Sequence, residues 1–424
     1  MEYITNNLMQ RWGTKYTEYL VVRVFAYISV LLICLFSSCC NNPSRGGSVL
    51  PTIDIEEAVR DFSSVKLSEY CADIEYTPLE TYDSCLLSCK EKSAVIGNLL
   101  FLYEGIPPTY CLVFNLDGKF IGKLGDYGNS ANEYLHISGF AADITANEIF
   151  IQSGNKILAY DFRTLEFKDS FPIGNSIPAM TYRLTEFGYF AGRFILSGSH
   201  YFTDNPTLFV LDKSDNIVMA DSISFDKYEI EPTETGTPGT LGMSHSDAYL
   251  WTYNDTLSYI SRLSDTLYGY DLNFNKYPRF IVDAGKYKLK KEMSNLEESA
   301  ILLGTRIFEN DRLLICQMIM RHSDRVKFNP SGSRIGTIVF DKLKSQTLLL
   351  PCAVEDKFRG SFENDLDNGA PFRVMATCGN KMYQIISALD FISLADKYNS
   401  PKMKEIAAGL NDESNPVLVA VTLK

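Results

Sequence analysis

The chain has 424 residues, which is too long for one ordinary compact core and indicates several domains or a fold that grows by repetition. Hydrophobic residues make up 46% and charged residues 22%, so wholesale disorder is excluded. The formal net charge is -12 and no basic block stands out, so we expect no nucleic-acid partner.

The N-terminus has the pattern of an export signal. Arg11, Lys15 and Arg23 precede an apolar run over residues 24–36. About 13 residues are too few to span a bilayer comfortably, but they suit the apolar region of a signal peptide. Residues 1–38 are therefore expected to be a signal peptide.

Small residues precede a cysteine at the end of this run, in Phe36-Ser37-Ser38-Cys39, as in a bacterial lipobox. In that motif the cysteine is acylated and becomes the new N-terminus. Cys40 fits less well, because Cys39 would then stand directly before it. We expect Cys39 to be the lipidation site; the alternative is an ordinary anchor helix with incidental cysteines. Residues 39–55 are expected to form a flexible tether.

Seven cysteines lie beyond the signal, an odd number that excludes complete internal pairing: Cys71, Cys85, Cys89, Cys111, Cys316, Cys352 and Cys378. Export would permit disulfides, but the spacing of these cysteines matches no zinc pattern. We expect most of them to be buried apolar residues on strands.

After about residue 55, short runs rich in Val, Ile, Phe and Tyr alternate with turns, which indicates strands. Four segments repeat one order, an apolar strand, a polar turn of about four residues and a second strand: 111–121, 157–167, 208–218 and 338–348. Repeated hairpins indicate a propeller or a related radial array.

Two segments show helical periodicity instead, residues 288–303 and residues 401–410. The second has Ser400 as a plausible N-cap and Pro401 at the first helical position. We expect short helices in both places.

Several scattered segments resemble the six-bladed β-propeller lipoproteins of Gram-negative bacteria, a family related in shape to NHL-type propellers. They are 114–125, 128–134, 265–268, 277–285, 365–372 and 415–419, in the family's order. The resemblance implies an all-β domain over residues 56–424, a six-bladed β-propeller of four-stranded antiparallel blades with a few short helices in loops. It also implies a cell-envelope lipoprotein of the outer membrane, but no general activity.

The glycine-rich stretch of residues 122–143 could be a phosphate loop or a turn between strands. A phosphate loop leads directly into a helix, whereas this stretch leads into a strand-like segment and lacks the lysine of a P-loop. We therefore expect an inter-blade turn, with Glu133 and Tyr134 locking it by hydrogen bonds and packing.

Metal binding has little support in the sequence. Acidic residues alternate in Asp365-Leu366-Asp367-Asn368, but the rest of the EF-hand spacing is missing, so we expect a solvated or self-bonded loop. The chain has four dispersed histidines and no H-E-x-x-H or G-x-S-x-G motif. No metal, cofactor or catalytic residue is predicted.

Two functions remain open at this point. The first is a lipid-anchored, non-catalytic binding or scaffolding propeller, monomeric, with a membrane contact through its lipid and a protein or glycan partner. The alternative is a glycan-active enzyme, a hydrolase or lyase, with its site at the central channel mouth. Carboxyl groups about 5–10 Å apart at that mouth would favour the enzyme.

The chain also predicts how the ring closes. Residues 416–423 form an apolar run rich in β-branched residues, and Pro416 can enter a strand without disrupting its ladder. We expect this run to complete a blade together with N-terminal residues, either 64–68 or 74–79, because an open seam would expose strand edges.

Overall fold

In the computed structural model the chain divides into two compact units, Met1–Val49 and Leu50–Lys424, and the described strands and helices belong to the second. The described residues are 49–60, 64–88, 92–104, 109–173, 176–177, 182–200, 207–221, 248–261, 264–288, 300–321, 335–350 and 360–424.

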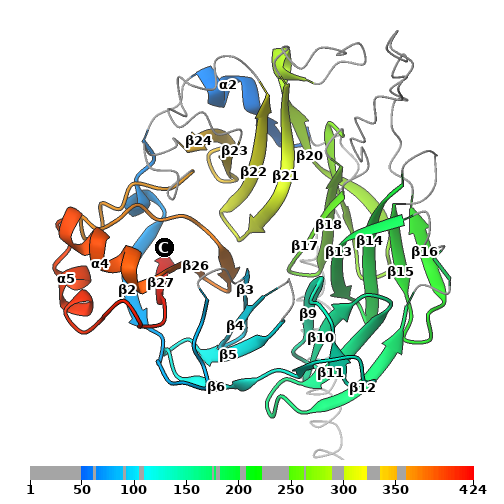
Figure 1. The fold of residues 1–424 in the computed structure, drawn as a ribbon. Coiled ribbons are helices and arrows are strands. Elements are labelled where there is room, and N and C mark those ends of the chain that lie inside the picture. Colours follow the sequence, from blue (N-terminus) through cyan, green and yellow to red (C-terminus); the bar gives the residue numbers. More distant parts are fainter. Residues whose placement is uncertain are drawn as a thin grey trace, which may run out of the picture. The chain divides into compact units, whose positions relative to one another are not determined.

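Six blades, each of four antiparallel strands, are arranged in a ring, as Figure 1 shows, and the sheet of blade 4 has one further strand at its outer edge. Blade 1 consists, from the centre outwards, of β3 (Lys92–Ile96), β4 (Leu99–Tyr103), β5 (Cys111–Asn115) and β6 (Phe120–Lys123). Blade 2 consists of β9 (Gly139–Asp143), β10 (Glu148–Ser153), β11 (Lys156–Asp161) and β12 (Phe167–Pro172). Blade 3 consists of β13 (Tyr182–Phe190), β14 (Arg193–His200), β15 (Leu208–Leu211) and β16 (Ile217–Asp221).

The second half of the ring repeats this pattern. Blade 4 consists of β17 (Ala248–Tyr253), β18 (Thr256–Ser261), β19 (Thr266–Tyr270) and β20 (Lys276–Asp283). Blade 5 consists of β21 (Ala300–Glu309), β22 (Leu313–Arg321), β23 (Ile335–Asp341) and β24 (Gln346–Leu350). Blade 6 consists of β25 (Ala376–Cys378), β26 (Lys381–Ile386), β27 (Val417–Leu423) and β2 (Cys71–Pro78). The predicted all-β, six-bladed propeller is confirmed.

Ring closure occurs in blade 6, where the C-terminal strand β27 pairs with the early strand β2. The register joins Ile74 to Val421 and Pro78 to Val417. Both faces of β27 are buried: residues 417, 419 and 421 pack against apolar side chains of blade 5 and of the helices, and residues 418 and 420 pack against blade 1. The predicted closure is thus confirmed for residues 74–78, whereas Lys66, in the other candidate segment, forms an isolated bridge with Glu363.

The segment that precedes β2 wraps around the outer side of blade 5. Its strand β1 (Thr52–Asp54) pairs in parallel with β20 of blade 4, and α2 (Ile55–Arg60) buries Ile55, Ala58 and Val59 in the core shared by blades 4 and 5. A short 3-10 helix, η1 (Leu67–Glu69), then leads into blade 6. Residues 52–55 therefore lie in the folded domain and not in the tether where the sequence analysis placed them.

The four repeated hairpins are the outer strand pairs of blades 1, 2, 3 and 5. Each begins its turn with an Asp or Asn whose side chain accepts hydrogen bonds from backbone N–H groups two to four residues later: Asn115, Asp161, Asp212 and Asp341. Asp271 does the same in blade 4. This side-chain cap explains why the repeat shows an Asp or Asn at the end of the strand.

The described residues contain three α-helices. Two of them, α4 (Ala388–Lys397) and α5 (Pro401–Ala407), lie between β26 and β27. Helix α5 confirms the prediction, since the Ser400 hydroxyl accepts a hydrogen bond from the Met403 N–H at 3.0 Å. Helix α4 was not predicted from the sequence, although Ser387 caps it in the same way.

The helix expected over residues 288–303 is wrong for its described parts. Residues 300–303 are the start of strand β21, with Ile301 and Leu303 buried against blade 4, and residues 285–287 form the 3-10 helix η2 (Gly285–Tyr287). Ile301 and Leu303 are buried two residues apart, which is the period of a strand, and their burial overrides the local helical propensity. The remaining residues of this prediction lie outside the described part.

Candidate functional site

The two ends of the ring differ in the length of their connections. Because consecutive strands are antiparallel, the turns after the first strand of every blade and after the third strand of blades 1 to 5 lie at one end. These turns have two to five residues, such as 97–98 and 212–216, and we call this the short-turn end. The other end carries the links between blades and between second and third strands, up to residues 222–247 and 387–416. We call it the long-connection end.

Some predicted positions cannot be placed in the fold. Cys39, like the cysteines Cys89 and Cys352, lies outside the described residues. The five described cysteines beyond it are all free, and four of them are buried: Cys71, Cys85, Cys111 and Cys316. Burial raises the pKa of the Cys111 thiol, which makes it a packing group and not a nucleophile.

The glycine-rich stretch is a turn between blades 1 and 2, as predicted. Its strands β7 (Asp126–Tyr127) and β8 (Glu133–Tyr134) form a two-residue parallel pair. The Glu133 carboxylate accepts a hydrogen bond from the Ser130 N–H at 2.8 Å, and the Tyr134 hydroxyl donates to the Leu124 carbonyl at 2.9 Å. These bonds close the turn on itself, so its N–H groups are not arranged for a phosphate.

The acidic loop of blade 6 is bonded to the protein and not open to a cation. Asp365 accepts hydrogen bonds from the N–H and the hydroxyl of Ser68, at 2.9 and 2.6 Å. Asp367 accepts from the Tyr76 hydroxyl and from the side chains of Asn364 and Ser400. This confirms the self-bonded loop, and no group of three His, Cys, Asp or Glu residues suited to a metal occurs among the described residues.

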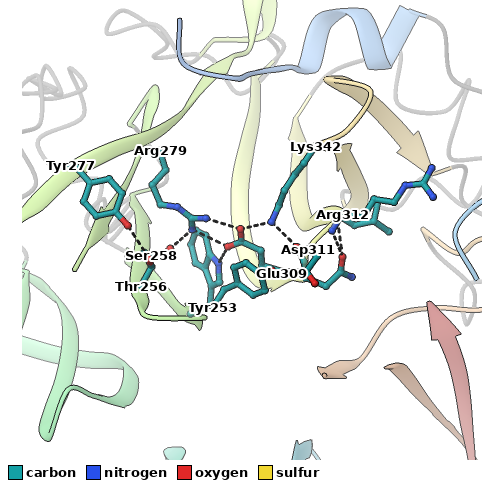
Figure 2. A network of polar contacts seen from close by, with 12 residues as sticks. Tyr253, Thr256, Ser258, Tyr277, Arg279, Glu309, Asp311, Arg312 and Lys342 are labelled. Atoms are coloured by element: carbon teal, nitrogen blue, oxygen red, sulfur yellow. Dashed lines mark hydrogen bonds and ion pairs between the residues drawn. The ribbon is translucent and has the colours of Figure 1, made fainter. Parts of the chain in front are cut away.

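A buried ion cluster joins blades 4 and 5 at the short-turn end. Glu309, the last residue of β21, has a side chain that is 0% exposed. Its carboxylate lies 2.7 Å from Nη2 of Arg279 and 2.7 Å from Nζ of Lys342, and it accepts a hydrogen bond from Trp251 Nε1 at 2.7 Å. Figure 2 shows the two cations approaching Glu309 from opposite sides.

Arg279 comes from β20, the outermost of the four strands of blade 4, and reaches inward across two strands. Gly269 makes this path possible, because a Cβ at that position would lie 2.7 Å from Cδ of Arg279. On the way the guanidinium donates to the Ser258 hydroxyl, as seen in Figure 2. A glycine in a strand interior thus leaves room for a side chain from a neighbouring strand.

The electrostatics of the cluster show one carboxylate shared by two cations. Burial raises the pKa of Glu309, but the hydrogen bonds and charges of Arg279 and Lys342 outweigh it and hold the pKa below its ordinary value. Burial and the charge of Arg279 lower the pKa of Lys342 more than Glu309 raises it. Because the side chain of Glu309 has no exposed surface, its carboxylate cannot touch a substrate, and the ion cluster serves to join blades 4 and 5.

The innermost strands of blades 3 and 5 carry irregularities at mid-length. The pairing of β13 with β14 shifts between Leu184 and Glu186, and that of β21 with β22 shifts between Leu303 and Ile307. Arg306 belongs to the second bulge, and its side chain is exposed. Bulges redirect side chains and are frequent beside functional sites. Sequence patterns did not reveal these positions, because a bulge requires no particular residue type.

No helix in the described part of the chain combines the length and the apolar character needed to cross a membrane.

Comparisons with known proteins support the fold. The chain matches the family described as domain of unknown function (DUF4934) over residues 50–422. A crystal structure of a protein from Bacteroides fragilis, described as exported, superimposes with a TM-score of 0.65 at 15% identity, over 89% of this chain and 100% of the other. A DUF4221 family member from Bacteroides vulgatus gives a TM-score of 0.45 at 10% identity, over 84% and 97%. No curated protein matches the sequence.

Proposed function

The chain belongs to the family described as domain of unknown function (DUF4934), and we propose that it is a non-catalytic binding or scaffolding propeller, anchored by a lipid on Cys39 in the bacterial outer membrane. The partner is a protein or a glycan, bound at the long-connection end of a monomer.

This proposal rests on the difference in length between the connections at the two ends of the ring. Turns at the short-turn end are tight and closed by their own side chains, as Asp212 and Asp271 illustrate. The long-connection end carries all the extended segments, including the one with α4 and α5. Long connections positioned by a rigid scaffold are the usual place of binding residues. In a propeller they converge from every blade on one face.

The envelope location is supported by the N-terminus and by a neighbour in structure. The apolar run before Cys39 has the length of a signal-peptide core. The Bacteroides fragilis protein that superimposes over 89% of the chain is described as exported. Both observations favour a chain that leaves the cytoplasm.

Catalysis on glycans has no specific support among the described residues. The carboxylates of Glu309, Asp341 and Asp367, of which the first two are buried and the third is half-buried, are each held by protein donors. A general acid or base must be able to reach the proton that it transfers, and these three groups cannot. We therefore favour binding.

The test is photo-crosslinking in intact cells with a photoreactive amino acid at one exposed leucine at a time. Leu135 and Leu389 are 44% and 64% exposed in segments of the long-connection end. Leu272 and Leu343 are 52% and 77% exposed in turns of the short-turn end. The two pairs are matched in residue type and differ in the end of the ring that they report.

We expect adducts from Leu135 or Leu389 and none from Leu272 and Leu343. Adducts confined to the short-turn end would overturn the proposed binding face. Absence of adducts from all four positions would argue against a stable partner at either end.

A further inference from the structure

The folded domain begins at the outer edge of the ring, between blades 4 and 5. Strand β1 pairs in parallel with β20 of blade 4, and the Ile281 N–H donates to the Pro51 carbonyl at 2.9 Å. On its other side, the Asp54 N–H donates at 2.9 Å to the Thr347 hydroxyl of β24, the outer strand of blade 5. The start of the domain is therefore fixed to both blades.

The direction of the chain through this edge is fixed as well. Strand β20 runs from the short-turn end to the long-connection end, and β1 is parallel to it, so the chain enters from the side of the short-turn end. Helix α2 then continues towards the other end, where the Glu56 carboxylate accepts a hydrogen bond at 3.0 Å from the Lys286 N–H of η2. The long-connection side of this edge is thus the side on which α2 lies.

Two exposed leucines lie in the short turns beside this entry point. Leu272 belongs to the turn that directly precedes β20 and is 52% exposed. Leu343 belongs to the turn that directly precedes β24 and is 77% exposed. Because β1 lies between β20 and β24, both leucines are on the side from which the chain arrives. Large aliphatic side chains at the tips of turns gain free energy when an apolar phase covers them.

The proposed lipid anchor would keep this side of the domain close to a membrane. Residues 40–49 separate Cys39 from Leu50, and a chain of that length spans at most about 35 Å when it is fully extended. A flexible chain of the same length spans about 17 Å on average. Such a short tether holds the nearest turns at a high effective concentration beside the lipid, so that a weak apolar contact is sufficient.

We propose that the short-turn end of blades 4 and 5 rests on a phospholipid surface, with Leu272 and Leu343 inserted at the boundary between headgroups and acyl chains. The inference rests on the proposed lipid anchor and gives the orientation of the ring on the membrane. The formal net charge of -12 disfavours electrostatic attraction to anionic lipids, so the contact is apolar. The long-connection end then faces away from the lipid, where a partner can reach it.

The experiment measures the quenching of tryptophan emission by brominated phospholipids. The lipidated protein is reconstituted in vesicles of phosphatidylethanolamine and phosphatidylglycerol, with or without bromine on the acyl chains. Leu272→Trp and Leu343→Trp each place a tryptophan in one of the two turns. Leu135→Trp and Leu389→Trp are the matched controls, because these leucines are 44% and 64% exposed in segments of the long-connection end. Trp251, the native tryptophan beyond the predicted signal peptide, is buried and gives the same background in every variant.

We expect brominated lipids to remove most of the emission that the new tryptophan adds in Leu272→Trp and Leu343→Trp, and to leave the two control variants unchanged. The quenching should persist at high salt, because salt screens charges and does not weaken apolar contacts. Loss of the quenching at high salt would contradict an apolar contact.

Three other results would overturn the proposed orientation. Quenching confined to the control variants would show that the long-connection end faces the lipid. Equal quenching in all four variants would show that the domain has no preferred face. Absence of quenching in all four would show that the domain stands away from the membrane on its tether.

Flotation of the vesicles reports the anchor independently of the orientation. A protein that floats with the vesicles but is not quenched in Leu272→Trp and Leu343→Trp contradicts this inference alone. A protein that does not float contradicts the proposed anchor as well. Lipid adducts at Leu272 or Leu343 in the crosslinking experiment would agree with the contact, since a phospholipid is neither the protein nor the glycan partner sought there.

Discussion

Nη2 of Arg279 lies 2.7 Å from Oε1 of Glu309, although the two residues belong to neighbouring blades. Blades of a propeller otherwise touch mainly through apolar side chains, which provide stability but little orientation. A charged pair with fixed geometry sets the position of one sheet relative to the next. Here it does so at the short-turn end, where the connections themselves are too short to cross between blades.

Replacing Glu309 by Gln should destabilise the domain strongly. The substitution removes the charge that compensates two half-buried cations, Arg279 and Lys342. Breaking a buried ion pair by removing one partner costs about 3–5 kcal/mol. Urea unfolding should show this loss, whereas Glu413→Gln, at an exposed position, should stay within about 0.5 kcal/mol of the wild type. Equal stability of the two variants would contradict a stabilising role of this ion cluster between blades 4 and 5.

Protonation of the Glu309 carboxylate should account for part of the loss of folding stability at low pH. Burial raises the pKa of Glu309, but Arg279 and Lys342 hold it below its ordinary value. A group with a lowered folded pKa contributes stability that is complete above the unfolded pKa and is lost as the pH falls through the folded one. Between about pH 5 and about pH 3 the wild type should therefore lose more stability than Glu309→Gln. Parallel pH profiles of the two proteins would show that the carboxylate is not specifically stabilised in the fold.

Two glycines with positive φ allow the cost of backbone strain to be measured separately from the cost of steric crowding. Gly118 has a φ of 84°, and a Cβ there would lie 2.3 Å from the carbonyl oxygen of Pro78. Gly379 has a φ of 57° and open space around that position. Gly379→Ala should cost about 1–2 kcal/mol from the left-handed conformation alone. Gly118→Ala should cost about 1–3 kcal/mol more, because the turn must move away from β2. Calorimetric midpoints give the order, and a reversed order would be inconsistent with the contact.

Removal of residues from Asn415 onwards should lower the stability of the whole ring. The deletion strips β27 from between β26 and β2 and exposes two strand edges. It also removes the Asn415 amide, which donates to the carbonyls of Glu80 and Cys85 at 2.6 and 2.9 Å. Thermal unfolding should show a lower midpoint for a single transition. An unchanged midpoint would mean that closure does not depend on this strand.

Substitution of Cys39 by Ala should abolish metabolic labelling with palmitate and release the protein from membranes. The reason is that the acyl chains would be attached to this sulfur, and they supply the apolar anchor. Cys40→Ala is the matched control and should leave labelling intact. Labelling that persists in Cys39→Ala but is lost in Cys40→Ala would move the site by one residue.

Local patterns determined much of the architecture. Apolar runs of strand length and the recurring Asp or Asn at the turn indicated the outer hairpins, because each such turn is closed by its own side chain, as at Asp212. The β-branched run 416–423 predicted the closing strand, since its residues suit a strand covered on both sides. Ser400 and Pro401 predicted α5 from capping alone. All of these signals act within a few residues of the chain.

Features that depend on contacts between residues far apart in the chain were decided only by the tertiary structure. Residues 300–303 became strand because Ile301 and Leu303 are buried between two blades, a context that helical periodicity does not contain. Strand β1 and helix α2 belong to the domain because β20 of blade 4 offers a strand edge and blades 4 and 5 offer apolar side chains that the helix covers. The pairing of Arg279 with Glu309 exists only once blades 4 and 5 have packed against each other. Charges interact through space, and the packing of the two blades brings these groups within reach of one another.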